Sequence, residues 1–352
     1  MGIAKSLLFA KSILGANLSR PRSPFKLSFA ITYACNMRCK MCNIWKKERS
    51  REELDLKRIE EFFRRLKNVF WLGITGGEPF LRPDVADIAR LAVERCRRLD
   101  TLHFATNAQL GTRILETVAG LKRIKRPPRL VFTISLDGPR ALHDSIRGAP
   151  GSWDRAVGVF RELKKTPGVK AQIGFTISEH NAGRFAEAFA ELKSAWPPLK
   201  FDDINVNVFQ RSSFYYENEK MSPPQPAAVL GEIARILALD RDSFSVNNFL
   251  RRTYLRLYPR FLRTGKSPLP CQALSSTCFL DPYGDLYPCA VYKKKLLNVA
   301  QMRDDFETEW SSSGARALAR ECAGNACPGC WSPCDAFSAI GGSLFQAGLD
   351  AG

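Results

Sequence analysis

The chain has 352 residues, of which 45% are hydrophobic and 25% charged, and this composition excludes disorder over most of its length. Lysine and arginine outnumber aspartate and glutamate by 53 to 35, which gives a formal net charge of +18. This excess favours an anionic partner, such as nucleic acid, anionic lipid, a phosphorylated substrate or an acidic peptide, although a basic solvated surface explains it equally well.

Residues 1–26 form a basic N-terminal segment with five cations, no acidic residue and apolar residues at roughly helical spacing. Such a segment can lie on an anionic membrane surface, or its apolar face can pack onto the rest of the fold. The apolar stretch Ser6–Leu18 is interrupted by Lys11 and has no clear cleavage site, and no run approaches the ~18 apolar residues of a membrane span. We therefore expect a cytoplasmic protein, with the inner face of the membrane as an alternative location.

Residues 27–210 alternate short apolar, β-rich runs with longer helical patterns. The predicted strands are Leu27–Thr32, Val69–Thr75, Leu102–Thr106, Leu130–Leu136, Ala171–Ile177 and Ile204–Phe209. The predicted helices between them are Leu56–Lys67, Val85–Arg97, Arg113–Leu121, Trp153–Lys165 and Ala182–Ala195. This alternation implies right-handed crossovers and a parallel sheet, and six such units predict an α/β fold, a partial (β/α)6 TIM-like barrel. In such barrels functional residues lie at the C-terminal ends of the strands.

Three cysteines, Cys35, Cys39 and Cys42, follow the first predicted strand with the spacing C-x3-C-x2-C. Thiolates at this spacing suit a loop wrapped around a [4Fe–4S] cluster, whose fourth iron then lacks a local protein ligand and stays open to a substrate or cofactor. The alternatives are a zinc site or a chance grouping. Structural zinc sites have four ligands, usually in two separated pairs, and no obvious histidine or cysteine nearby completes this one.

This triad resembles the signature of the radical S-adenosylmethionine (SAM) superfamily, in which it follows the first barrel strand. The resemblance implies that the open iron chelates the amino and carboxylate groups of SAM. It also implies that electron transfer from the cluster breaks a C–S bond, giving methionine and a 5′-deoxyadenosyl radical that abstracts hydrogen. The family usually has an aromatic residue before the third cysteine, where this chain has Met41, so contact with the adenine would differ.

Two further motifs follow the second and third predicted strands. The sequence GGEP at Gly76, Gly77 and Glu78 resembles the family motif that binds the SAM amino group. Two glycines let the backbone approach a ligand closely, and the Glu78 carboxylate can accept a hydrogen bond from an ammonium group. At Asn107 the chain reads TNA where the family commonly has TNG, which makes Asn107 another candidate for the SAM site.

The fourth predicted strand leads into the sequence SLDG, which contains Ser135 and Asp137, and then into HDSIRG, which contains Arg147. The resemblance makes Ser135 and Arg147 candidates to hold the SAM ribose and carboxylate, with Asp137 in the same site. Arginine suits a carboxylate because its planar donor fork can bind both oxygens. Each motif alone is weak, but four motifs in family order, each at the end of a predicted strand, together favour the family.

Residues 211–269 are predicted to form a helical linker, with helices over Pro226–Leu239 and Ser243–Leu262. Residues 243–270 carry six cations and no acidic residue, again with apolar residues at roughly helical spacing. Like the N-terminal segment, they can lie on an anionic membrane surface or pack onto the barrel.

A cysteine-rich C-terminal domain is predicted over residues 270–336, followed by a tail, residues 337–352. Its seven cysteines are Cys271, Cys278, Cys289, Cys322, Cys327, Cys330 and Cys334. Residues 278–289 are predicted to form a hairpin with its turn at residues 281–284. The isolated Cys96 is expected to be structural.

This cysteine spacing resembles the SPASM/twitch extension of radical SAM enzymes, which implies one or two auxiliary [4Fe–4S] clusters. The ligands expected for at least one cluster are Cys271, Cys289, Cys327 and Cys330. The further candidate ligands are Cys278, Cys322 and Cys334. Disulfides are the alternative, although clustered cysteines in a reducing cytosol indicate metal ligands first.

The expected activity is reductive SAM cleavage followed by hydrogen abstraction from a substrate. Relatives with this extension commonly modify peptides or proteins, so a peptide or protein is favoured slightly over a lipid, an isoprenoid or a small alcohol. No peptide-recognition module is expected within residues 1–26. The net charge leaves RNA modification as an alternative, and an iron–sulfur binding protein without catalysis is the non-enzyme alternative. The expected electron donor is a flavodoxin or ferredoxin.

Overall fold

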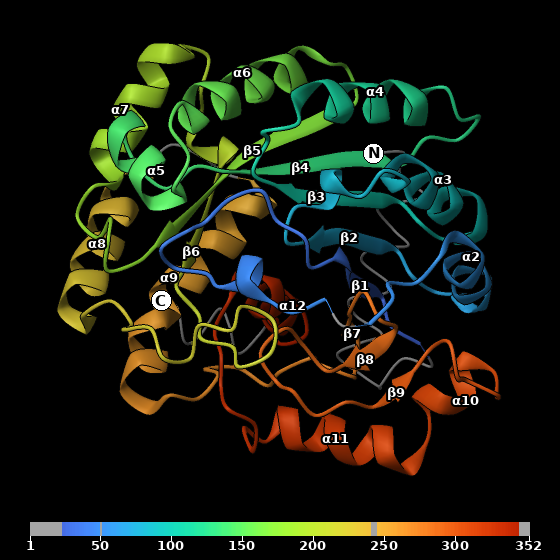
Figure 1. The fold of residues 1–352 in the computed structure, drawn as a ribbon. Helices are drawn as coiled ribbons and strands as arrows, with labels where there is room; N and C mark the ends of the chain where they lie inside the picture. Colours follow the sequence, from blue (N-terminus) through green and yellow to red (C-terminus); the bar gives the residue numbers. More distant parts are fainter. Residues whose placement is uncertain (1–22, 50, 241–244, 345–352) are drawn as a thin grey trace.

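The computed structural model describes residues 23–49, 51–240 and 245–344, and it confirms the α/β class expected from the sequence. Within these residues, one nine-stranded sheet has the order β6-β5-β4-β3-β2-β1-β7-β8-β9. Figure 1 shows this sheet curving beneath an outer layer of helices. The basic segment predicted over residues 1–26 falls outside the described residues up to position 22, as does the end of the predicted tail from residue 345.

The first six strands and their helices form the barrel-like part. Its strands are β1 (Lys26–Thr32), β2 (Trp71–Gly76), β3 (Thr101–Thr106), β4 (Arg129–Ser135), β5 (Val169–Ile177) and β6 (Ile204–Val208). Its helices are α2 (Leu56–Arg65), α3 (Val85–Arg95), α4 (Gly111–Lys122), α5 (Arg140–Arg147), α6 (Ser152–Lys165) and α7 (Phe185–Ala195). All six predicted strands are confirmed, with ends shifted by one or two residues at most. Helix α5, which carries Arg147, was not predicted as a separate helix.

Adjacent strands from β1 to β6 are parallel, so their C-terminal ends meet at one edge. The register between β1 and β2 shifts between Ala30 and Thr32, which places Thr32 opposite Gly76. The loop that leaves β1 therefore begins beside the glycine pair at the end of β2.

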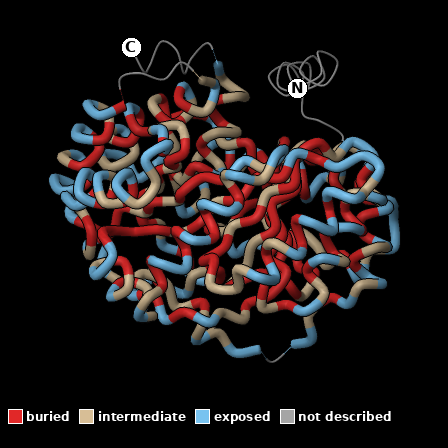
Figure 2. Tube along the Cα trace, turned by 90° about the horizontal axis from the view of Figure 1, so that it is seen from above, coloured by how far each residue is buried: buried red, intermediate tan, exposed pale blue. Residues whose placement is uncertain are grey.

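The two faces of the sheet differ in polarity because successive side chains of a strand point to opposite sides. Residues such as Phe29, Phe104 and Phe132 are fully buried beneath the helices. On the other face, His103 Nε2 and Thr133 Oγ1 lie 2.8 Å apart, and Gln172 donates a 2.9 Å hydrogen bond to the same hydroxyl. Figure 2 shows the buried stretches running through the interior and the exposed ones on the outer turns. The inner face of the barrel is thus lined partly by polar groups.

The C-terminal part extends the same sheet rather than forming one of its own. Its strands are β7 (Thr277–Leu280), β8 (Asp285–Tyr287) and β9 (Leu297–Asn298), and its helices are α8 (Pro226–Leu239), α9 (Val246–Thr264), α10 (Phe306–Trp310), α11 (Ser313–Ala323) and α12 (Pro333–Gly341). Strand β7 pairs in parallel with β1, starting with Lys26 opposite Thr277. Strands β7 and β8 form the predicted hairpin, and its turn is fixed by Asp281, whose carboxylate accepts hydrogen bonds from the amides of Tyr283 and Asp285.

Most of the second basic segment, residues 243–270, lies in helix α9. Its Arg251 is 1% exposed and forms a 2.7 Å ion pair with Asp240, while Tyr254 and Leu257 pack into the core. The apolar face therefore packs onto the fold, and the exposed cations of this helix, such as Arg256, lie on the opposite side. No helix among the described residues is both long and apolar enough to span a membrane.

Candidate active site

The three cysteines of the triad lie on the loop between β1 and a short 3-10 helix, η1 (Ile44–Lys46). Backbone hydrogen bonds tie this loop to the end of α5: the Arg38 amide donates to the Arg147 carbonyl at 3.3 Å, and the Lys40 amide to the Ile146 carbonyl at 2.8 Å. Gly148 terminates α5 with φ 63°, and a Cβ there would lie 2.9 Å from the Arg38 carbonyl oxygen. The loop and the helix end are therefore packed backbone to backbone.

Within the loop, backbone amides point at the cysteine sulfurs. The Met37 amide donates to Cys35 Sγ and the Ile44 amide to Cys42 Sγ, each from two residues further along the chain. Burial nevertheless raises the pKa of Cys35 to about 11 and that of Cys42 to about 12. Both thiols are thus protonated near neutral pH unless a metal displaces the proton, which is the behaviour of ligands that ionise on metal binding.

The glycine pair Gly76 and Gly77 allows a close backbone approach, as the sequence suggested. The segment that approaches it is the start of the cysteine loop. A Cβ on Gly76 would lie 2.2 Å from the Thr32 carbonyl oxygen, and one on Gly77 would lie 2.2 Å from the Ala34 carbonyl oxygen. The Gly77 amide donates to the former oxygen and the Glu78 amide to the latter, at 2.9 and 2.8 Å. Glycine at both positions lets the end of β2 clasp the start of the cysteine loop.

Glu78 is fully buried directly behind this contact. Its carboxylate accepts hydrogen bonds from the Thr106 hydroxyl and the Asn107 amide, both at 2.7 Å, and from the Phe80 amide at 3.2 Å. Burial raises the pKa of Glu78 to about 7, against the effect of these hydrogen bonds. The Asn107 side chain also donates to Asn36 Oδ1 at 2.8 Å, so the third strand end is joined to the cysteine loop.

Arg147 lies beside the thiols with a buried carboxylate behind it. Its Nη1 is 3.6 Å from Cys39 Sγ, and its Nη2 forms an ion pair with Asp137, which is fully buried. Burial opposes the charge of Arg147, but Asp137 and Cys39 raise its pKa above the ordinary value. Asp137 is held in turn by the Thr176 amide at 2.8 Å. Ser135 ends β4 at the same edge and is half-buried.

His143 supports this arrangement from α5. Its Nδ1 accepts a 3.1 Å hydrogen bond from the Asp137 amide, and burial, with the nearby Arg147 charge, lowers its pKa to about 3. The buried Nε2 of His143 and Nε of Arg147 have no hydrogen-bond partner in the described part of the chain. Three thiols, a charged fork and unpaired buried donors at one edge fit a cluster with an anionic, chelating ligand.

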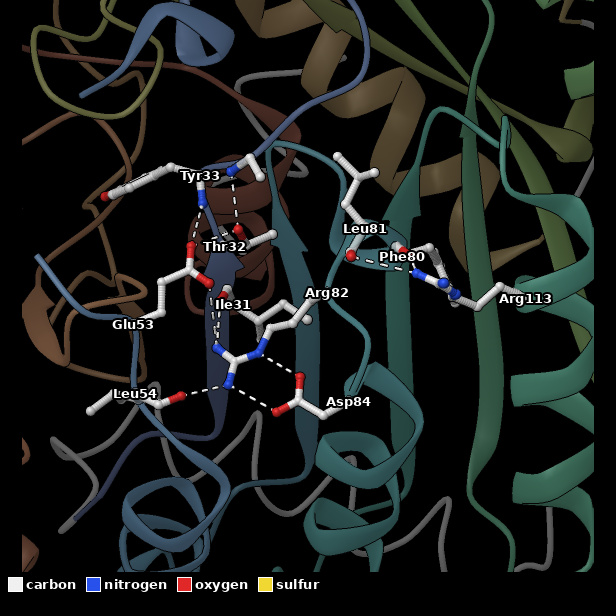
Figure 3. Close-up of polar contacts among 11 residues, drawn as sticks. Ile31, Thr32, Tyr33, Glu53, Leu54, Phe80, Leu81, Arg82, Asp84 and Arg113 are labelled. Carbon is white, nitrogen blue, oxygen red and sulfur yellow. Dashed lines mark hydrogen bonds and ion pairs between the residues drawn. The ribbon is translucent and has the colours of Figure 1, made fainter. Parts of the chain in front are cut away.

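Figure 3 shows how the outer side of this edge is fixed. The Arg82 guanidinium donates to the carbonyls of Ile31 and Leu54 at 2.8 and 2.5 Å, while Glu53 accepts hydrogen bonds from the Thr32 hydroxyl and the Tyr33 amide. An open pocket of about 330 Å³ lies here, and none of the triad cysteines lines it. The network thus braces the start of the cysteine loop from outside.

A segment that sequence reasoning missed covers the loop from the other side. The Tyr215 hydroxyl donates to the Gly76 carbonyl at 2.9 Å, the Tyr216 carbonyl accepts from the Asn43 amide at 2.9 Å, and Asn218 donates to the Met41 carbonyl at 3.1 Å. These residues fall in the stretch taken only as a linker. The aromatic run Phe-Tyr-Tyr before a Pro-rich stretch is the sequence feature that could have indicated a buried segment covering the cysteine loop.

The C-terminal cysteines divide by their surroundings. Backbone amides two residues along donate to Cys271, Cys289 and Cys327, at 3.4 Å for the first two, which is the pattern of the triad loop. A hydrogen bond with Cys289 and burial raise the pKa of Cys330, and a hydrogen bond from Cys322 lowers the pKa of Cys327. The structure therefore brings five of the predicted ligands into one group.

Cys278 stands apart from that group, whereas Cys334 lies at its edge, close enough to Cys289 for that thiol to raise the Cys334 pKa. Cys278 lies on β7 in the main hydrophobic core, and burial alone raises its pKa, so the geometry does not join it to the other thiols. Cys334, in the first turn of α12, is exposed as a residue, and its thiol lies near Tyr215 and Tyr216. Cys96 lies alone in the core with its thiol 3.8 Å from the Phe63 carbonyl, as expected for a structural residue.

Known proteins are similar to this chain over most of its length. Residues 29–196 match the family model described as the radical SAM superfamily. Mycofactocin maturase MftC of Mycobacterium ulcerans is 26% identical over 319 residues, which covers 88% of this chain and 80% of that protein. The antilisterial bacteriocin subtilosin biosynthesis protein AlbA of Bacillus subtilis is 22% identical over 345 residues, covering 93% of this chain and 68% of AlbA.

Solved structures share the fold. SuiB of Streptococcus suis bound to S-adenosylmethionine has a TM-score of 0.59 at 18% identity, covering 83% of this chain and 66% of SuiB. SuiB bound to the precursor peptide SuiA has a TM-score of 0.58 at 17% identity, and the match covers 88% of this chain and 69% of SuiB.

Proposed function

Because the chain belongs to the radical SAM superfamily, we propose that it cleaves SAM reductively and abstracts hydrogen from a peptide or protein substrate. The observation that carries the proposal is the meeting of Cys39 with the fork of Arg147 at the C-terminal edge of the barrel. A thiol loop alone fits several metals, whereas a thiol loop with a braced arginine at its side fits a cluster that must also hold a carboxylate.

The residues of this edge have separate parts in the proposed reaction. Cys35, Cys39 and Cys42 would hold a [4Fe–4S] cluster with one open iron. The chemistry that the bound cluster supplies is one-electron reduction of SAM, which cleaves a C–S bond and yields methionine and the 5′-deoxyadenosyl radical. Arg147 would orient the SAM carboxylate, because Asp137 fixes the direction of its fork.

Glu78 would accept from the SAM ammonium group. Its three hydrogen bonds to the strand ends hold the carboxylate in one position, and its pKa of about 7 leaves it ready to ionise beside a cation. Ser135 and Asn107 lie at the neighbouring strand ends, where they would contact the ribose and the cysteine loop.

A peptide substrate is supported by the relatives. MftC is named as a maturase, and SuiB was solved with a precursor peptide. Cys271, Cys289, Cys327 and Cys330 would hold an auxiliary [4Fe–4S] cluster, and the chemistry it would supply is acceptance of one electron from an oxidised peptide.

The electron that starts each turnover would come from a flavodoxin or ferredoxin. Exposed cations on and beside the cysteine loop, among them Arg38, Lys40 and Lys46, favour an acidic carrier docking there. The protein would act in the cytoplasm. Contact with an anionic membrane would involve the basic residues 1–26.

Deuterium transfer tests the substrate class. Cells grown in deuterated medium are extracted and separated into peptide, lipid, RNA and small-molecule fractions, and each is incubated with reconstituted enzyme, SAM and reductant. We expect deuterium in 5′-deoxyadenosine only from the peptide and protein fraction, because the radical takes the substrate hydrogen. Label from the lipid or RNA fraction would contradict the proposed substrate.

A further inference from the structure

We propose that helices α8 and α9 form a docking surface for an anionic membrane, with Leu239, Val246 and Phe249 entering the headgroup layer. The inference concerns where the protein lies in the cell, and it does not depend on the proposed reaction. Among the residues that the structure describes, five large apolar side chains are exposed, and four of these lie on α8 and α9. The four are Leu230, Leu239, Val246 and Phe249.

Three of these side chains lie where α8 ends and α9 begins. Leu239 is the last residue of α8 and is 47% exposed. Val246 is the first residue of α9 and is 71% exposed, and Phe249, one turn further along, is 44% exposed. Apolar side chains exposed singly across a surface are ordinary, whereas several at the ends of two consecutive helices indicate an interaction site.

The exposed face of α9 continues from Phe249 as a row of arginines spaced three or four positions apart. The row consists of Phe249, Arg252, Arg256, Arg260 and Arg263. Residues at this spacing share one face of a helix, and the row runs for about 21 Å along it. The opposite face is fixed in the core by the fully buried Tyr254 and Leu255, so the row is held toward solvent.

The charge of this face is positive. No acidic residue occurs between positions 245 and 280. Asp202 and Asp240, which do contact α9, form ion pairs at 3.9 and 2.7 Å with Arg251, on the buried side of the helix. Exposed arginines on a face of this kind are attracted to the negative potential of a membrane that contains anionic lipid.

The combination of the two features selects a lipid surface as the partner. Nucleic acid would pair with the arginine row, but its phosphates give Leu239 and Val246 no apolar surroundings. A second copy of the chain, meeting this face across a two-fold axis, would bring two arginine rows together. At a membrane surface the arginines reach the lipid phosphates while the apolar side chains sit deeper, as in interfacial amphipathic helices.

The test measures flotation of the full chain with phosphatidylcholine vesicles that contain or lack phosphatidylglycerol. One variant, V246S/F249S, removes apolar side chains, and a second, R256S/R260S/R263S, removes three cations. The matched controls are L344S, which removes the fifth exposed apolar side chain, and R97S/R98S/R123S, which removes three exposed arginines elsewhere. Urea unfolding of each variant shows whether its fold is retained.

We expect the parent to bind only the vesicles that contain phosphatidylglycerol, and to bind more weakly at higher salt. Each α9 variant should bind about tenfold more weakly or worse, whereas both controls should match the parent. Hydrogen exchange of the unmodified chain gives a second reading that needs no variant. Anionic vesicles should slow exchange at the start of α9, near Val246 and Phe249.

Four results would overturn the inference. The first is a parent that does not bind anionic vesicles. The second is binding that both α9 variants retain, with slowed exchange confined to residues 1–26, which would place the contact in the N-terminal segment. The third is RNA binding through the arginine row without vesicle binding. The fourth is a dimer of the parent that V246S/F249S dissociates, which would make a second copy the occupant of this face.

Discussion

The triad loop and the C-terminal cysteine group hold thiols by different means. The triad loop is clasped by backbone, with Gly76 and Gly77 on one side and Gly148 on the other. In the C-terminal group, thiols are fixed largely by one another and by the first turn of α12, as in the pairs Cys289–Cys330 and Cys322–Cys327. The triad loop is thus fixed by the backbone of the barrel, whereas the C-terminal thiols are fixed mainly by contacts among themselves.

The largest expected effect comes from breaking the backbone clasp with Gly77→Ala. A Cβ 2.2 Å from the Ala34 carbonyl forces the cysteine loop away from β2, so we expect loss of most of the triad iron and about 3 kcal/mol or more of stability. Gly120→Ala in α4 is the matched control, since a Cβ there meets no atom within 4 Å, and alanine should stabilise the helix by about 0.5–1 kcal/mol. Iron assays and urea unfolding measure both; normal iron loading in Gly77→Ala would show that the clasp is dispensable.

Arg147→Ala should weaken SAM binding at least 100-fold and lower the free energy of unfolding by about 3 kcal/mol, because Asp137 is left buried without its partner. Arg140→Ala, on the same helix, removes an exposed pair with Asp154 and should change stability by less than about 1 kcal/mol. Equilibrium dialysis with labelled SAM gives the affinities. Equal affinities in the two variants would remove Arg147 from the SAM site.

Cys289→Ala and Cys278→Ala sharpen the comparison within the C-terminal part. We expect Cys289→Ala to lose the auxiliary cluster, because its sulfur lies within 4.8 Å of the Cys330 sulfur and close to Cys271. Cys278→Ala should keep that cluster and lose only about 1–2 kcal/mol of stability, since its side chain fills the core. Iron content after anaerobic reconstitution distinguishes them, and cluster loss in Cys278→Ala would make it a ligand after all.

His143 gives the smallest effect, through pH. Because its pKa falls from 6.5 to about 3 on folding, the unfolded chain binds its proton first, and stability is lost as pH falls below 6.5. One pH unit below that value should cost about 1.4 kcal/mol. Because Glu78, with its pKa raised to about 7, gains stability over the same range, the test is the difference between variants: on going from pH 7.5 to 5.5 in urea unfolding, His143→Gln should change in stability more favourably than the wild type and His180→Gln by about 1.4 kcal/mol. An identical pH dependence in all three would place the acid sensitivity elsewhere.

The sequence predicted most of the barrel because each strand is a short apolar run and the first four strands are each followed by a motif. The triad, Glu78 and Arg147 could be placed at one edge because parallel strands end together. Helix α5 was missed because it is short and rich in polar residues. The pairing of β7 with β1 joins residues about 250 positions apart, and no local pattern encodes such a contact.

The C-terminal ligands were only partly predictable for a related reason. The cysteine spacing alone could not show that Cys278 faces the core from β7. A four-residue strand is too short for its alternating pattern to indicate which side chains face the core. The contact between the Cys330 thiol and the Asp335 carboxylate, at 3.8 Å, follows from the packing of α12 on α9, and no local sequence pattern indicates it.

The most direct test of the central claim is formation of 5′-deoxyadenosine from SAM. Anaerobically reconstituted and reduced protein is compared with the C35A/C39A/C42A variant at equal protein concentration, with methionine measured in parallel. We expect both products in equal amounts from the wild type and neither from the variant. A fully loaded, reducible wild type that binds SAM and gives no 5′-deoxyadenosine, even with the active substrate fraction present, would contradict the proposed reaction.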